Sequence, residues 1–134
     1  MINKSWETVK KFNEKDVIEF AKLTGDNNRI HTDLEYAKNS IFGNTVVHGM
    51  FVASLFSKVF GKIFPGEGSI YLKQDLKFIF PVFVGDKIKA RVTLKKFEQK
   101  NFNGVFECIC LNQNDEKVVI GSALIKFPRD FKYN

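Results

Sequence analysis

The sequence predicts an α+β fold in which an antiparallel sheet wraps around a long central helix. Residues 49–64 are apolar nearly all round, as in a buried core helix. Four strand-like segments follow with no helical pattern between them, which argues against an alternating α/β arrangement. The chain has 134 residues, 44% of them apolar, so a single domain over residues 1–134 with one core is expected.

The elements before the central helix are predicted from the residues that begin and end them. An edge strand is expected over residues 5–12. Asn13 is a suitable N-cap for a first helix, and Gly25 is placed to end it in a left-handed conformation. In the central helix, small residues recur at every fourth position and let a sheet or a slender ligand approach the backbone: Gly49, Ala53, Ser57 and Gly61.

The strand-like segments after the central helix cover residues 69–80, 87–97, 104–113 and 117–127. A meander of antiparallel strands is expected from them. In the first segment one face is predicted to be apolar, with period two: Ile70, Leu72, Leu76, Phe78 and Phe80. Asp86 is interpreted as a turn residue between the first two segments.

Composition limits the classes of partner. The net charge of +6 and pI of about 9.3 favour anionic partners. The sequence has no dense Lys/Arg tract, however, so nucleic-acid binding is not predicted. No apolar run approaches a membrane span, and the N-terminus has no apolar leader region, so a cytoplasmic protein without membrane association is expected. Cys108 and Cys110, about 7 Å apart on one strand face, are predicted to be buried free thiols, and no metal site is expected.

A polar loop between two helical patterns holds the candidate reactive groups. Asp26 and His31 lie five positions apart in the stretch TGDNNRIHTDLEYA. Thr32 and Glu35 have the spacing of a capping box, which predicts that a second short helix begins directly after His31. An acid and an imidazole in one loop are typical of general acid–base chemistry, although Asp-x4-His alone is a weak pattern.

The stretch FAKLTGDNNRIHTDLEYA resembles the signature of the MaoC-like, (R)-specific enoyl-CoA hydratases. The downstream segments VVHGMFVASLFS, PGEGSIYL and FPVFVGD resemble that family in order and spacing, so the likeness runs from about Val17 to Phe127. Arg29 departs from the pattern, because the family usually has a proline there, which would stiffen the loop. The resemblance implies the hot-dog fold and a homodimer.

Hydration of a 2-enoyl thioester needs a deprotonated water, a proton for the α-carbon and stabilisation of charge on the thioester oxygen. The resemblance implies that Asp26 and His31 manage both proton movements and give an (R)-3-hydroxyacyl product; which of them protonates the α-carbon stays open. Gly49 opens the predicted central helix, where unpaired N–H groups and the positive dipole end could act as an oxyanion hole.

Further residues are assigned supporting roles. The family pattern places a serine at Ser57, hydrogen-bonding near the catalytic loop. Asn28 is interpreted as an orienter of the loop and His48 as a structural residue without an obvious partner. Phe60 and Ile125 either floor the acyl pocket or belong to ordinary core packing. Arg29 either grips a phosphate of coenzyme A or forms an ion pair with a neighbouring acid, Asp33 or Glu35, and the ion pair is favoured.

The sequence therefore predicts reversible, (R)-specific hydration of trans-2-enoyl-CoA. The expected partner is the acyl-CoA thioester, whose coenzyme A is part of the substrate, and no other cofactor is expected. Two alternatives stay open: a 3-hydroxyacyl-[acyl carrier protein] dehydratase, and a non-catalytic acyl-thioester-binding hot-dog module. Acyl length, direction and pathway, whether polyester precursor synthesis, β-oxidation or another acid route, are not predicted.

Overall fold

The computed structural model describes residues 1–132, so the last two residues of the predicted domain lie outside the described part. The elements follow in this order: β1 (Ser5–Lys11), α1 (Glu14–Thr24), α2 (Arg29–Thr32), α3 (Leu34–Lys38), α4 (Gly49–Lys58), the π-helical η1 (Val59–Ile63), β2 (Ile70–Phe78), β3 (Lys87–Glu98), β4 (Asn103–Leu111) and β5 (Lys117–Lys126). None of the helices described is long and apolar enough to cross a membrane.

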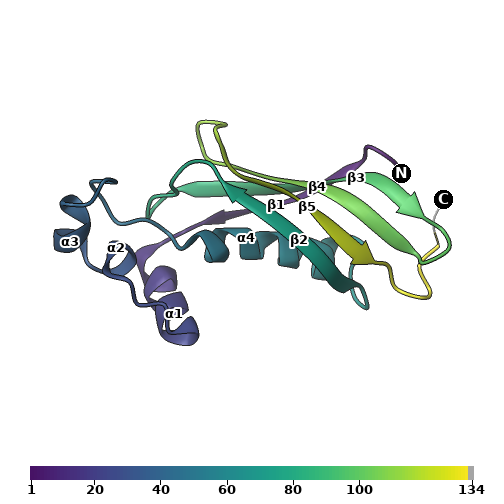
Figure 1. The fold of residues 1–134 in the computed structure, drawn as a ribbon, viewed down its shortest axis with the longest axis horizontal. Helices are drawn as coiled ribbons and strands as arrows, with labels where there is room; N and C mark the ends of the chain where they lie inside the picture. The colour runs from purple at the N-terminus through teal and green to yellow at the C-terminus, as the bar shows by residue number, and fades with distance from the viewer. Residues whose placement is uncertain (133–134) are drawn as a thin grey trace.

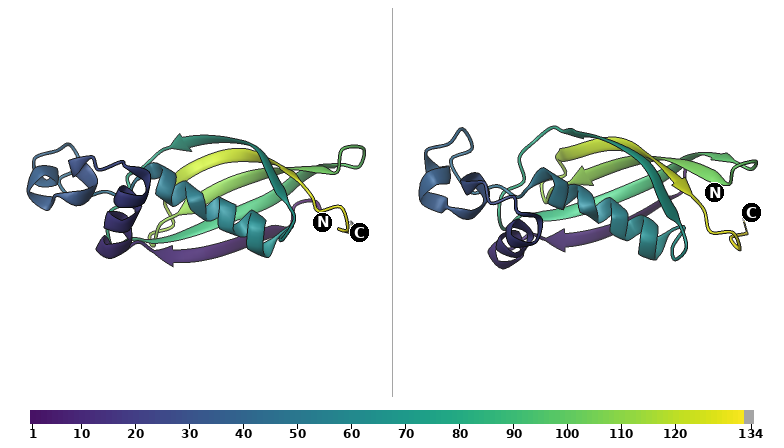
Figure 2. Two further views of the ribbon diagram at one scale, coloured as in Figure 1. Left: turned by 90° about the horizontal axis from the view of Figure 1, so that it is seen from below. Right: turned by 60° about the horizontal axis from the view of Figure 1, so that its bottom comes forward.

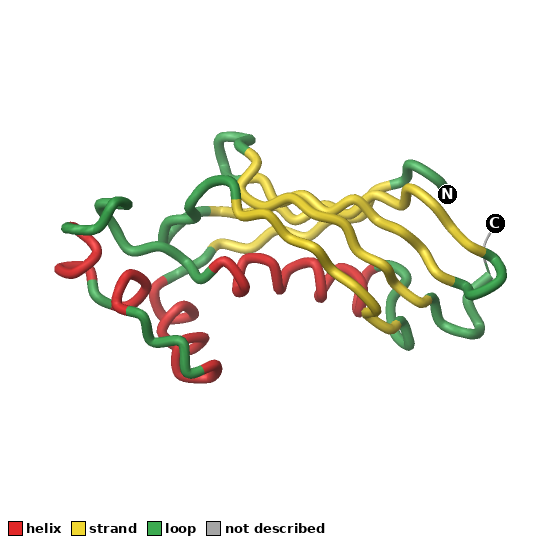
Figure 3. The backbone as a smooth tube through the Cα atoms, in the orientation of Figure 1, coloured by secondary structure: helices red, strands yellow, loops and turns green. Residues whose placement is uncertain are grey.

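The five strands form one antiparallel sheet in the order β1-β3-β4-β5-β2. The sheet curves around α4, and the helix runs along its concave face (Figures 1 and 2). This is the predicted α+β arrangement, the hot-dog fold. Figures 1 and 3 show that α1, α2 and α3 gather at the end where α4 begins, while the N-terminus lies at the opposite end.

The predicted meander is correct for β3, β4 and β5 and wrong for β2. β2 pairs with β5 and not with β3, so it forms an edge of the sheet. β3 already has β1 and β4 as neighbours, and the connection after β2 carries the chain across the sheet to reach it. Sequence neighbours pair often but not always, and long-range pairing decides here.

The predicted apolar face of β2 is correct for Leu76 and Phe78 and wrong for Ile70. The register of β2 shifts between Tyr71 and Lys73. This bulge reverses the face of the sheet to which the residues before it point. Tyr71 and Phe78 pair with buried positions of β5, whereas Ile70 pairs with the charged Lys126. Directly paired residues face the same side of a sheet, so Ile70 does not share the concave face with Phe78.

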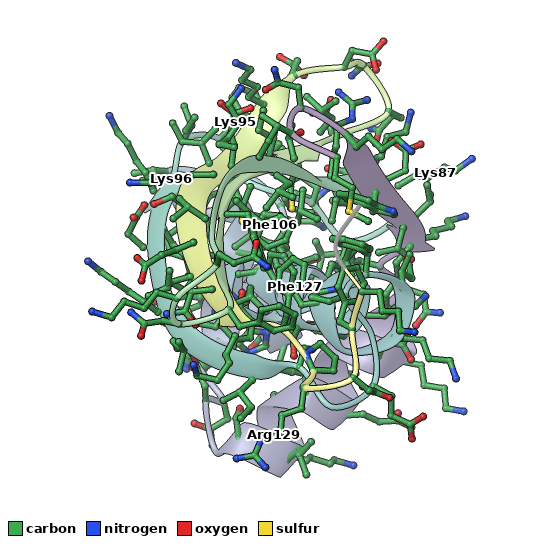
Figure 4. All side chains as sticks on the ribbon, turned by 90° about the vertical axis from the view of Figure 1, so that its right-hand side faces the viewer. Lys87, Lys95, Lys96, Phe106, Phe127 and Arg129 are labelled. Atoms are coloured by element: carbon green, nitrogen blue, oxygen red, sulfur yellow. The ribbon has the colours of Figure 1, made fainter. Side chains whose placement is uncertain are left out.

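The core fills the space between the sheet and α4. Val52, Ala53, Leu55 and Phe56 form the buried side of the helix, as the apolar segment predicts. Seen from one end in Figure 4, Phe106 and Phe127 lie inside the fold, whereas Lys87, Lys95, Lys96 and Arg129 point outward. A fully buried phenylalanine contributes about 1.5–3 kcal/mol relative to an exposed one, so the many rings account for much of the stability.

The two cysteines belong to this core. Cys108 and Cys110 are buried free thiols on β4, as predicted. Burial raises the pKa of each thiol to about 12, so both stay protonated near neutral pH. A protonated, buried thiol is a poor nucleophile, and these residues act as small core side chains.

The capping residues of α1, α2 and α3 determine where these helices begin and end. Asn13 accepts a hydrogen bond from the Asp16 N–H at 2.8 Å, and Gly25 has φ of +83°, so both predicted caps of α1 are confirmed. The predicted capping box is wrong, because Asn28 caps α2 and Asp33 caps α3. His31 therefore lies within α2 and not at the entrance of a later helix.

Candidate active site

A cavity of about 460 Å³ opens beside the first turn of α4. Its lining comes from three places: the loop after α1 with α2, the start of α4, and the chain from the end of β2 towards β3. Representative lining residues are Asp26, His31, His48, Gly49, Phe78 and Val82. Most of the other lining side chains are apolar, which suits an acyl chain beside a small polar end.

His31 has a fixed tautomer. Its Nδ1 lies 2.7 Å from the carbonyl oxygen of Val46. A carbonyl only accepts, so Nδ1 carries the hydrogen and Nε2 of the neutral ring has a free lone pair. Burial lowers the pKa of His31 below 6.5, and the bond to Val46 opposes this only in part. The ring is therefore suited to accept a proton at neutral pH.

Asp26 lies at the exposed turn that follows the αL cap of α1. Its N–H bonds to Thr24 Oγ1 at 3.2 Å, and its Oδ1 is 3.4 Å from the N–H of Asn28. Asn28 in turn caps α2 by accepting from the Ile30 N–H at 3.2 Å. These local bonds orient the loop, which agrees with the role predicted for Asn28.

The acid and the imidazole lie close enough to share a water. An oxygen of Asp26 and one ring nitrogen each of His31 and His48 all lie within 4.8 Å of one another. A water that donates to two acceptors at about 2.8 Å joins atoms about 4.5 Å apart. A carboxylate oxygen and an imidazole nitrogen at about this spacing can be bridged by one water.

The same trio is poorly arranged for a metal ion. The rings of His31 and His48 are stacked, with centroids 3.7 Å apart and planes 23° apart. Nitrogen lone pairs lie in the ring planes, so those of two stacked rings run side by side and do not converge on a tetrahedral ion.

His48 has partners that the sequence analysis missed. Its ring is 2% exposed, and its Nε2 lies 2.9 Å from the backbone oxygen of Asp26. The residue is distant from Asp26 and His31 in sequence, and only the docking of α4 against the loop brings the three together. Its position directly before Gly49, the first residue of α4, was the one available signal.

Gly49 begins α4, as predicted, and lines the cavity. Its N–H has no acceptor within the helix and lies at the positive end of the helix dipole. A Cβ at this position would come within 2.7 Å of the Phe78 ring, so the ring is seated directly against the glycine. Phe78 at the end of β2 is thus a site residue that sequence analysis assigned only to an apolar strand face.

Besides Asn28, three predicted site residues do not line this cavity. Ser57 is exposed, more than two turns along α4 from Gly49, and does not line it. Phe60 and Ile125 are 2% and 0% exposed and belong to the core. Within residues 1–132 the structure brings together Asp26, His31 and Gly49, but not these three.

Arg29 differs from the favoured prediction. Its guanidinium lies 4.3 Å from the centroid of the Tyr36 ring. Glu35 pairs with Lys38 at 3.2 Å, and Asp33 accepts from the Tyr36 N–H, so neither acid pairs with Arg29 in the part of the chain described. The expected ion pair is wrong, and a cation–π contact holds the side chain instead.

Comparison with known proteins places this site in a family. The profile of the family described as "MaoC like domain" matches residues 2–109. The (R)-specific enoyl-CoA hydratase of Aeromonas caviae is 39% identical over 119 residues, covering 89% of each chain. The mitochondrial 3-hydroxyacyl-[acyl-carrier-protein] dehydratase of Solanum lycopersicum is also 39% identical, over 87% of this chain and 71% of that protein.

The fold gives the same answer as the sequence comparison. The solved structure of the A. caviae (R)-hydratase involved in PHA biosynthesis superposes with a TM-score of 0.93 at 36% identity. The superposition covers 96% of this chain and 97% of that one. With the matching profile, the close relatives and the shared hot-dog fold, the chain is a hydro-lyase of the MaoC-like dehydratase family.

Proposed function

We propose that this enzyme catalyses the reversible, (R)-specific hydration of trans-2-enoyl-CoA. The observation that carries the proposal is the meeting of Asp26, His31 and the N-terminus of α4 at one apolar cavity. The A. caviae relative, named an (R)-specific enoyl-CoA hydratase, matches this chain over nearly its whole length.

In the proposed mechanism one water lies between Asp26 and His31 and donates a hydrogen bond to each. As its oxygen forms a bond to the β-carbon, one O–H bond breaks and the pair takes up the proton. The pair then delivers a proton to the α-carbon on the same face, so addition is syn. Positioned acid–base groups of this kind contribute roughly 10²–10⁴-fold to rate.

Negative charge grows on the thioester oxygen during the attack. The N–H of Gly49 at the start of α4 is the proposed donor to this oxygen, and the helix dipole adds to the effect. Loss of such a donor costs about 2.7–4 kcal/mol in other oxyanion holes. The donor is therefore expected to matter about as much as the acid–base pair.

A second candidate function differs only in the carrier of the acyl chain. The tomato relative acts as a 3-hydroxyacyl-[acyl-carrier-protein] dehydratase according to its name, and it is as similar in identity as the A. caviae hydratase. The positive net charge suits either an acidic carrier protein or the phosphates of coenzyme A. Comparing kcat/KM for crotonyl-CoA and crotonyl-carrier protein decides between them.

We also propose that the enzyme is a homodimer formed through β2. This edge strand has β5 on one side and, within residues 1–132, no strand on the other. It exposes apolar side chains, with Ile70 53% and Leu72 45% exposed. The opposite edge, β1, carries Lys10 and Lys11, which discourage pairing. A second copy of β2 would protect the apolar edge.

The test of the proposed function uses purified enzyme and crotonyl-CoA. Loss of absorbance at the enoyl thioester band reports hydration, and chiral analysis of the product reports its configuration. The proposal expects turnover and (R)-3-hydroxybutyryl-CoA. An (S) product would contradict it, and no turnover with either carrier would leave only the non-catalytic thioester-binding alternative.

A further inference from the structure

His48 contacts both members of the proposed catalytic pair. Its Nε2 donates to the backbone carbonyl of Asp26 over 2.9 Å, and its ring stacks on His31 at 3.7 Å. The first contact fixes the turn that carries the carboxylate, and the second supports the face of the imidazole. One side chain thus links two groups whose separation determines whether a water can bridge them.

The ring of His48 is itself held in place. It is 2% exposed and contacts the Phe20 ring at 4.8 Å. Phe20 stacks on Phe51 at 4.5 Å with planes 4° apart. The four rings form a column that joins α1, α2 and the first turn of α4. Packing of this kind restricts rotamers, so His48 transmits the position of the helix N-terminus to the loop.

The hydrogen bond of His48 shows which ring nitrogen carries a hydrogen. Since the Asp26 carbonyl only accepts, the hydrogen of the ring is on Nε2, and Nδ1 is an acceptor. Nδ1 is buried and has no hydrogen-bond partner among the described residues. The nitrogen that carries the hydrogen is occupied by the backbone carbonyl of Asp26, so the ring is placed to hold the loop.

We propose that His48 is a positioning residue, which sets the spacing between the Asp26 carboxylate and His31 without exchanging protons itself. This inference rests on the proposed hydration reaction. A displacement of about 1 Å in a catalytic constellation can cost about a hundredfold in rate, so a modest shift of the loop would be enough to slow the enzyme. Substrate binding along the apolar cavity would change little.

Two substitutions separate the two contacts. His48→Phe keeps an aromatic ring against His31 and removes the hydrogen bond to Asp26. His48→Gln keeps an N–H donor and removes the ring. Each variant is expected to lower kcat for crotonyl-CoA by about tenfold or more with KM within about twofold, the pattern of a lost transition-state effect. Val92→Ala, at a fully buried position of β3, is the control for lost stability.

The decisive measurement is a double-mutant cycle with Asp26→Asn. If His48 acts through the pair, His48→Phe should slow the Asp26→Asn enzyme by much less than it slows the wild type. An equal effect in both backgrounds, or wild-type kcat in both His48 variants, would overturn the proposal. A decrease in kcat matched by Val92→Ala at the same loss of Tm would also overturn it.

The test distinguishes a loss of folding from a loss of activity in the folded enzyme. The Tm of each variant is measured first, and kcat is determined at least about 15 °C below it; if His48→Phe does not fold, His48→Gln takes its place in the cycle. Inactive wild-type enzyme on both carriers would refute the proposed function. Active wild type with active, uncoupled His48 variants would refute only the positioning role.

Discussion

The ring of His31 and the carbonyl of Val46 are joined by a 2.7 Å hydrogen bond, so Nδ1 carries the hydrogen and Nε2 of the neutral ring has a free lone pair. Val46 belongs to the segment that leads into α4, and its own N–H bonds to the Ile30 carbonyl at 3.1 Å. The loop, α2 and the start of α4 are thereby tied together by backbone groups. The tautomer of His31 is thus set by a main-chain acceptor.

Partial burial of His31 has a measurable consequence. Burial lowers its pKa from 6.5, because the charged ring loses hydration. The ring should therefore stay neutral to a pH below 6.5 and lose its basic form only under more acid conditions. The chain has only two histidines, so NMR titration with His48→Gln as the assignment variant can follow His31 directly. A midpoint at or above 6.5 would contradict this account of the site.

Gly49 is predicted to be essential because of its missing side chain. Gly49→Ala should lower kcat by up to about a hundredfold, since a methyl group blocks the approach of the thioester oxygen to the helix N-terminus. The new Cβ would also meet Phe78 at 2.7 Å. Phe78→Ala removes this contact, so the double variant should remain much slower than Phe78→Ala alone. Recovery of activity in the double variant would show that Gly49 serves packing only.

The dimer is predicted to depend on the exposed edge of β2. Light scattering should give about twice the chain mass of 15.4 kDa at micromolar concentration. Leu72→Glu places a charge on this edge and should shift the protein towards the monomer. Leu23→Glu, at an 86% exposed leucine of α1, should leave the dimer intact. A wild-type monomer would exclude the proposed assembly.

Phe60 is predicted to act in the core. It is 2% exposed and contacts the rings of Tyr71 and Phe106. Phe60→Ala should reduce the free energy of unfolding by about 3–5 kcal/mol, measured with urea, and leave the chain-length preference unchanged. A variant that accepts longer enoyl chains would instead restore the acyl-pocket role suggested by the sequence.

Local patterns were enough to predict most of the secondary structure. The apolar segment forms α4 and η1, and Asn13 and Gly25 cap α1. These features could be predicted because they depend on residues a few positions apart. The caps of α2 and α3 were mistaken although they are also local. Asn28 accepts from the Ile30 N–H and so begins α2. Asp33 accepts from the Tyr36 N–H and begins α3, because short Asx side chains reach such groups well.

Long-range relationships were outside the reach of the sequence. The pairing of β2 with β5, and the bulge after Tyr71, depend on how the sheet closes around α4. The contact of His48 with Asp26 requires two distant segments to dock. The loop pattern predicted Asp26 and His31 as neighbours, but nothing local indicated the ring column that supports them or the cation–π contact of Arg29.

The central claim is that Asp26 and His31 together activate the water. The most direct test is the rate of crotonyl-CoA hydration by Asp26→Asn and His31→Ala, with folding checked by circular dichroism. Asn27→Ala, an exposed neighbour in the same loop, is the matched control. The account predicts a loss of at least about a hundredfold in each catalytic variant and near-normal turnover in the control. Near-normal turnover in either folded catalytic variant would contradict it.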